Sequence, residues 1–173
     1  CRSCCKAWGF LSGGMAATTW KTVILPMNWN RWRTRRLTGG WMFILEAAAC
    51  RCLQDLEILE PDWLALLKQW EQAPELPGFA PQDPEKLERI AVYFAFRYLL
   101  KAVNDGDLLG RAQFCALGVL VTDRLSRFVG LPEALRLFSR EIEHSEDNLD
   151  TLLEQFWQTE GLSLSALLSA FGG

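Results

Sequence analysis

Apolar residues recur every three or four positions along most of the chain after residue 83. Between residues 84 and 104 the repeat includes Leu87, Ile90, Ala91, Phe94, Tyr98 and Leu99. This is the spacing of one buried face of an α-helix. Similar patterns predict helices over 108–128, 133–144, from 146 onward and over 164–171. An upstream helix opening at Glu60-Pro61 would bury Trp63, Leu64, Leu67 and Trp70.

Polar residues and glycines mark the ends of these expected helices. Asp83, Asp107, Ser145 and Ser163 stand where side-chain oxygens accept hydrogen bonds from the first turn of a helix. Gly106 and Gly130 stand where a chain leaves a helix. No alternating strand pattern follows residue 53, so the sequence predicts an all-α fold, a helical bundle with short connections.

Charge divides the chain into two parts. Residues 1–52 hold eight Lys/Arg and one acid, whereas residues 53–173 hold ten Lys/Arg and twenty acids. We therefore expect a basic, Cys/Trp-rich, poorly structured segment at 1–52 and an acidic α-helical domain at 53–173. Out-of-frame reading of a GC-rich gene is a second explanation for the composition of residues 9–49.

Five of the six cysteines lie in the N-terminal part. Thiolates hold zinc or an iron–sulfur cluster, and a closed site needs about four ligands. Cys1, Cys4 and Cys5, completed by Cys50 and Cys52, are therefore candidate metal ligands. The alternative is that these are reduced thiols without a metal. Cys115 lies in an apolar helix and is expected to be a small core residue.

Other features exclude or weaken further classes of function. Glu141 and the only histidine, His144, have the Glu-x-x-His spacing of di-iron bundles, but a second such pair is missing. "NRWRTRR" is one short basic run in an acidic protein, so we expect no nucleic-acid partner. The chain lacks a secretion signal and a stretch long enough to span a bilayer. We expect a cytoplasmic protein with reduced thiols. Because its first residue is Cys and not Met, we also expect a fragment or a processed product.

Two stretches resemble the C-terminal half of the flagellin lysine N-methylase family. Tyr93–Leu125 contains "YF-x-x-R" and a "DGD" turn, and Ser139–Phe156 contains "EHS-x-x-N". The opening "CCKAW" resembles the family's N-terminal cysteine cluster, although Ala7 replaces a glycine and the spacing before the cysteine pair is shorter. The resemblance covers residues 53–160 and 1–8, and residues 9–49 do not match.

The resemblance implies a methyltransferase that transfers methyl groups from S-adenosylmethionine to lysine ε-amines of flagellin, with cysteines that bind an iron–sulfur cluster or zinc. Candidate catalytic residues are Asp105, Asp107, Arg97, Glu141 and His144, with roles unassigned. A turn, a cap or an interhelical hydrogen bond would also explain each of them. The alternative function is a non-catalytic helical module that binds a protein partner.

Overall fold

The computed structural model describes residues 39–73 and 83–172, which all belong to one unit spanning residues 36–173. These residues are helical, with no strand among them, which confirms the all-α prediction. Residues 1–38, most of the expected basic segment, lie outside the described part. The elements are α4 (Gly39–Asp55), α5 (Pro61–Gln72), α6 (Pro84–Tyr98), η1 (Leu99–Lys101), α7 (Ala102–Asp105), α8 (Leu108–Val129), α9 (Leu131–Phe138), η2 (Ser139–Glu143), α10 (Glu146–Gln158), η3 (Glu160–Leu162) and α11 (Leu164–Gly172).

The helix boundaries follow the polar residues that the sequence marks. Asp83 accepts a hydrogen bond from the Lys86 amide at 3.1 Å, and Asp107 accepts one from the Gly110 amide at 2.9 Å. Ser145 and Ser163 cap α10 and α11 in the same way, accepting from amides at 3.2 and 3.3 Å. These caps satisfy amides that have no partner within a helix.

Helix α4 lies mostly within residues 1–52, the basic segment that was expected to be poorly structured. Met42, Leu45, Ala49, Cys52 and Leu53 are buried along it. Their spacing is that of a helix face that packs against other helices. The change in charge near residue 52 therefore does not coincide with a structural boundary.

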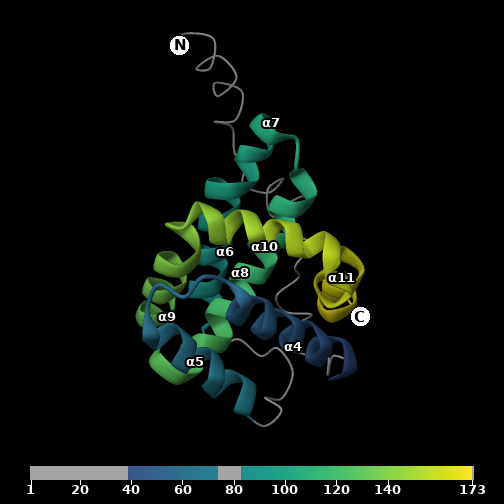
Figure 1. The fold of residues 1–173 in the computed structure, drawn as a ribbon. Helices are drawn as coiled ribbons and strands as arrows, with labels where there is room; N and C mark the ends of the chain where they lie inside the picture. Colours follow the sequence, from purple (N-terminus) through teal and green to yellow (C-terminus); the bar gives the residue numbers. More distant parts are fainter. Residues whose placement is uncertain (1–38, 74–82, 173) are drawn as a thin grey trace. The chain divides into compact units, whose positions relative to one another are not determined.

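Helix α8 lies at the centre of the arrangement (Figure 1). Every residue from Leu117 to Ser126 is buried, and α8 contacts α5, α6, α9, α10 and α11. Helix α4 contacts α5, α10 and α11, so it covers another side of the bundle. On α5 the buried residues are Trp63, Leu66, Leu67 and Trp70, so Leu66 takes the place predicted for Leu64.

A cluster of aromatic rings joins α6, α8 and α9. Phe94 and Phe138 lie 5.6 Å apart between ring centroids, and Tyr98 and Phe114 lie 4.6 Å apart, both edge to face. Gly118 permits this packing, because a Cβ atom there would lie 3.0 Å from the Phe94 ring. Close packing of this kind makes the core sensitive to lost volume.

The third expected helix, over 133–144, is regular only in its first half. Residues Ser139–Glu143 form a π-helical turn, which contains an additional residue per turn. The wider turn directs Glu141 toward the start of α5 and Glu143 toward α6. Among the described helices, none combines the length and the apolar run that crossing a bilayer requires.

Replacing Phe114 with alanine should remove the centre of the aromatic cluster. We expect the free energy of unfolding to fall by about 3–5 kcal/mol, because a fully buried ring is lost and a cavity remains. Phe43→Ala is the matched control, since Phe43 is 61% exposed and should change stability by only about 0.5 kcal/mol. Urea unfolding followed by circular dichroism measures both, and equal losses would contradict the assignment of the core.

Candidate functional site

The two family-like stretches meet at Glu143. Its Oε1 atom accepts hydrogen bonds from the Tyr93 and Tyr98 hydroxyls, both at 2.8 Å. The Arg97 Nε atom lies 3.3 Å from the same oxygen and donates to the Tyr98 hydroxyl at 3.1 Å. Tyr93 and Arg97 belong to "YF-x-x-R" and Glu143 to "EHS-x-x-N", so the two motifs are in direct contact. We call these four residues the Glu143 cluster.

The electrostatics of the Glu143 cluster keep its phenols protonated. Burial raises the pKa of Tyr93 and of Tyr98 above its ordinary value, and the hydrogen bonds to Glu143 raise it further. The Arg97 guanidinium lies 5.9 Å from the Tyr93 ring centroid and 5.7 Å from that of Tyr98. Phenols that donate to a carboxylate beside a guanidinium form a stable link between α6 and η2.

A shallow hollow of about 440 Å³ lies beside the Glu143 cluster, lined by Arg89, Ile90, Tyr93, Pro132, Leu135, Arg136, Ser139 and Glu143. Arg136 is already paired with Glu133 at 2.8 Å and with Glu60 at 3.1 Å. Arg89 therefore supplies the available positive charge. One arginine in an open hollow is a weak anion site.

Glu141 and Asn148 hold the chain where it enters α5. The Glu141 side chain is fully buried, and its carboxylate accepts hydrogen bonds from the amides of Leu59 at 3.0 Å and Glu60 at 2.6 Å. Asn148 accepts from the Glu57 amide at 3.0 Å and donates to the carbonyls of Glu57 and Glu141, both at 2.8 Å. We call this arrangement the Glu141 clasp. It satisfies partly buried backbone groups in the loop that leads into α5.

His144 points away from Glu141. Its ring is exposed, and Nδ1 lies 2.9 Å from the Ser139 carbonyl oxygen and 3.3 Å from the Ser139 hydroxyl. The Glu141 carboxylate is occupied by backbone amides, so this Glu-x-x-His pair does not converge on one point. Within residues 39–73 and 83–172, no three His, Cys, Asp or Glu side chains come close enough together to hold a metal ion.

Asp105 and Asp107 build the turn between α7 and α8. Asp105 accepts a hydrogen bond from the Asp107 amide at 2.9 Å and pairs with Arg111 at 2.7 Å. These contacts, the backbone hydrogen bond above all, hold the pKa of Asp105 below its ordinary value. Gly106 between them has φ +75°, which a residue with a side chain rarely adopts. Neither aspartate forms a hydrogen bond or ion pair with Arg97, Glu141 or His144 in the described part of the chain.

Cys50 and Cys52 are buried in α4. The Cys50 thiol donates to the Leu67 carbonyl and accepts from Gln54, with both sulfur distances 3.4 Å. Burial raises the pKa of each thiol to about 11. Side chains two residues apart on a helix point about 200° apart, and metals bind thiolates rather than thiols. These two cysteines do not fit a shared metal site, and Cys1, Cys4 and Cys5 lie outside the described residues.

Cys115 is half-buried on α8, and burial raises its pKa to about 12. It therefore resembles the small packing residue that the sequence predicts more than a reactive thiol.

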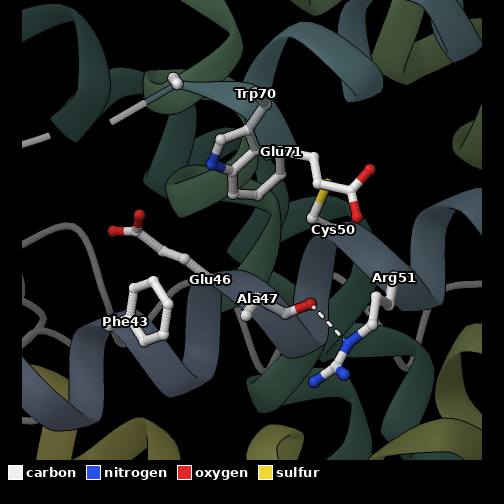
Figure 2. Close-up of a pocket in the computed structure, with 8 residues that line it drawn as sticks. Phe43, Glu46, Ala47, Cys50, Arg51, Trp70 and Glu71 are labelled. Carbon is white, nitrogen blue, oxygen red and sulfur yellow. Dashed lines mark hydrogen bonds between the residues drawn. The ribbon is translucent and has the colours of Figure 1, made fainter. Parts of the chain in front are cut away.

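Helices α4 and α5 enclose a hollow of about 390 Å³ that the sequence does not indicate. It is lined by Phe43, Glu46, Ala47, Cys50, Arg51, Trp70, Glu71 and Ala73, and we call it the α4–α5 hollow (Figure 2). Five of these eight residues come from the segment 1–52, which was expected to be poorly structured. The available signal was the spacing of Phe43, Glu46 and Cys50, which places them on one side of a helix.

Glu46 also belongs to a buried ion pair with Arg124. The Arg124 side chain is fully buried on α8 and donates from Nη2 to Glu46 Oε1, whereas its Nε and Nη1 atoms have no hydrogen-bond partner among the described residues. Burial raises the pKa of Glu46, and the nearby Arg124 opposes this rise. The pair therefore joins the floor of the α4–α5 hollow to the central helix.

The Glu141 clasp predicts a large effect of Asn148→Ala on stability. Removing the amide leaves the buried Glu141 carbonyl and the partly buried Glu57 amide and carbonyl without these partners, so we expect the free energy of unfolding to fall by about 2–3 kcal/mol. Asn104→Ala, at an exposed position with no hydrogen bond to a described side chain, is the control. Urea unfolding measures both, and an unchanged Asn148→Ala variant would contradict the clasp.

Both tyrosines of the chain belong to the Glu143 cluster. In the folded protein they should ionise only above the ordinary pKa of 10.0, and in urea near that value. Since the unfolded chain releases these protons first, their contribution to stability is complete below about pH 10 and falls as the pH rises. Ultraviolet absorbance of tyrosinate measures both states, and Tyr98→Phe should weaken the decline. Identical titrations in buffer and in urea would exclude this effect.

Comparison of the chain with protein-family models, with curated proteins and with solved structures gives no match. Its function therefore has to be argued from its own residues. Two features of the described residues bear on function: the Glu143 cluster, where the two family-like motifs meet, and the α4–α5 hollow.

Proposed function

We propose that this chain belongs to a lysine N-methylase-like protein that acts on flagellin or another Lys-bearing protein in the cytoplasm. In this proposal the helical part binds the protein to be methylated. S-adenosylmethionine would supply the methyl group, and Cys1, Cys4 and Cys5 remain candidate ligands of an iron–sulfur cluster or zinc. Cys50 and Cys52 are not among these ligands, because their buried thiols do not fit a shared metal site.

The contact between the two family-like motifs is the observation that carries this proposal. Tyr93 and Glu143 are fifty positions apart in the sequence, and the hydroxyl of one donates to the carboxylate of the other at 2.8 Å. Residues that define separate motifs of one family are expected to form a single structural unit when the resemblance is real. This contact supports the resemblance without assigning a catalytic role to either residue.

The charge of the helical part suits a Lys-bearing partner. Helix α10 exposes Glu146, Asp147, Asp150 and Glu154, and none of them forms an ion pair with a described residue. A surface with one sign of charge accelerates encounter with a partner of the opposite sign. The same charge does not perform methyl transfer, which requires a lysine that has lost its proton.

Methyl transfer sets a chemical demand that any reactive site must meet. A lysine ammonium has no free electron pair, and its ordinary pKa is about 10.4. A reactive site must therefore remove water from the amine or accept its proton. Asp105, Asp107 and Glu141 are occupied by amides or arginine, so we assign the helical part to binding.

A non-catalytic helical module is the second candidate function. It is favoured by one specific observation: Asp105 forms a turn, Asp107 caps a helix and Glu141 closes the clasp. These contacts account for the three acidic candidates without catalysis. In this case the chain would bind a protein partner and transfer no methyl group.

A transfer assay separates the two candidates. The chain is expressed and reconstituted with iron without oxygen, then incubated with flagellin and S-adenosylmethionine that carries an isotopically labelled methyl group. Mass spectrometry of flagellin peptides should find the label on lysine. Flagellin with acetylated lysines is the control and should remain unlabelled.

Binding of flagellin is measured in parallel by light scattering or calorimetry. Label on lysine supports the methylase-like function. Saturable binding without label supports the non-catalytic module and contradicts the methylase-like function. If flagellin neither binds nor becomes labelled, it is not the partner under either candidate function.

A further inference from the structure

The α4–α5 hollow combines a carboxylate with aromatic rings at one side. Figure 2 shows the Glu46 carboxylate, the Phe43 ring and the indole nitrogen of Trp70 on the same side of the hollow. Phe43 is 61% exposed, whereas Trp70 is 5% exposed and forms part of the wall. An aromatic side chain this exposed on a helix next to a hollow is available to a ligand.

Glu46 retains an acceptor on the side of the hollow. Its Oε1 atom accepts from Arg124, and its Oε2 atom accepts no hydrogen bond from a described residue. Glu46 lines the hollow, whereas its partner Arg124 does not. The hollow therefore faces the negative end of this ion pair.

The other charges of the hollow offset one another. Arg51 and Glu71 carry opposite charges, and Figure 2 shows both on the side away from Glu46 and Phe43. Arg51 Nε donates to the Ala47 carbonyl at 3.2 Å, and Glu71 accepts from Gln54 at 3.2 Å. The lining as a whole carries two carboxylates and one guanidinium, so its net charge is negative and disfavours anions.

A primary ammonium on an alkyl stem fits this arrangement. It has three N–H donors for a carboxylate oxygen, and its charge is attracted to the face of an aromatic ring. The apolar stem can lie along Ala47, Cys50 and the Phe43 ring while the charge reaches Glu46.

We propose that the α4–α5 hollow binds the side chain of a lysine on the partner protein, with its ammonium held by Glu46 and the face of the Phe43 ring. This inference rests on the proposed function for the identity of the partner. The bound lysine is an anchor and not the methyl acceptor, because a carboxylate and aromatic rings stabilise the protonated form.

Binding can be tested with n-butylammonium chloride as the probe, which needs neither partner nor methyl donor. In a ¹H–¹⁵N correlation spectrum of the full chain, the indole signal of Trp70, identified by its loss in Trp70→Phe, should shift in a saturable manner. 1-Butanol has the same stem without the charge and should cause no comparable shift. No saturable shift, or an equal shift with 1-butanol, would overturn the proposal.

Two variants connect the shift to the named residues. Phe43→Leu should weaken binding about two- to fivefold through the loss of a cation–π contact. Trp157→Leu, which removes a 68% exposed aromatic residue from α10, should leave it unchanged. Glu46→Gln should weaken binding about tenfold or more, with circular dichroism as the check that it folds. Because Phe43 is exposed, its variant stays informative if Glu46→Gln unfolds, and unchanged binding in Phe43→Leu overturns the proposal.

The outcomes also separate this inference from the proposed function. If flagellin is methylated, Phe43→Leu should raise KM with kcat unchanged, as expected for an anchor that acts on binding alone. Methylation with normal KM in Phe43→Leu would overturn the anchor and leave the methylase-like function standing. Saturable butylammonium binding in a chain that labels no flagellin would support the hollow and contradict the function.

Discussion

Helix α8 is buried on every side over its second half, and this constraint determines where the other helices lie. A helix without an exposed face in this region has to be covered by several neighbours, and α5, α6, α9, α10 and α11 contact it. Gly118 lets Phe94 and Phe138 approach it closely. Since Arg124 lies within the same buried stretch, α4 has to bring Glu46 as its partner.

The polar residues that attract a functional interpretation mostly satisfy the backbone of this bundle. Burying a helix end leaves amides without partners, and a carboxylate or side-chain amide is well suited to accept from them. Glu141, Asn148 and Asp107 do this at three different places. The Asp-Gly-Asp motif is therefore explained by the end of one helix and the start of the next. Glu46 differs, because it lines a hollow and its Oε2 atom accepts no hydrogen bond from a described residue, so it remains available to a ligand.

The sequence predicted features that depend on neighbouring residues, such as helix caps. It did not predict contacts between residues that are far apart in the chain. Asp83, Asp107, Ser145 and Ser163 were predicted as caps because a cap acts within three residues of its own position. The pairing of Tyr98 with Glu143 and of Arg124 with Glu46 depends on how helices cross, which periodicity does not contain. Helix α4 was overlooked because charge and composition were weighed above the spacing of Leu45, Ala49 and Leu53.

The chemistry of the hollow and the chemistry of methyl transfer place opposite demands on a lysine. A site made of Glu46 and Phe43 stabilises an ammonium and raises the pKa of the bound amine, so it lowers the population that can attack a methyl donor. A transfer site has to lower that pKa by removing water or opposing charge. In the proposed function these two demands therefore fall on two different lysine environments, one that recognises the charged side chain and one that neutralises it. The α4–α5 hollow suits only the first, because Glu46 keeps one oxygen without a hydrogen bond from a described residue, whereas the enclosed Glu141 carboxylate is occupied by backbone amides.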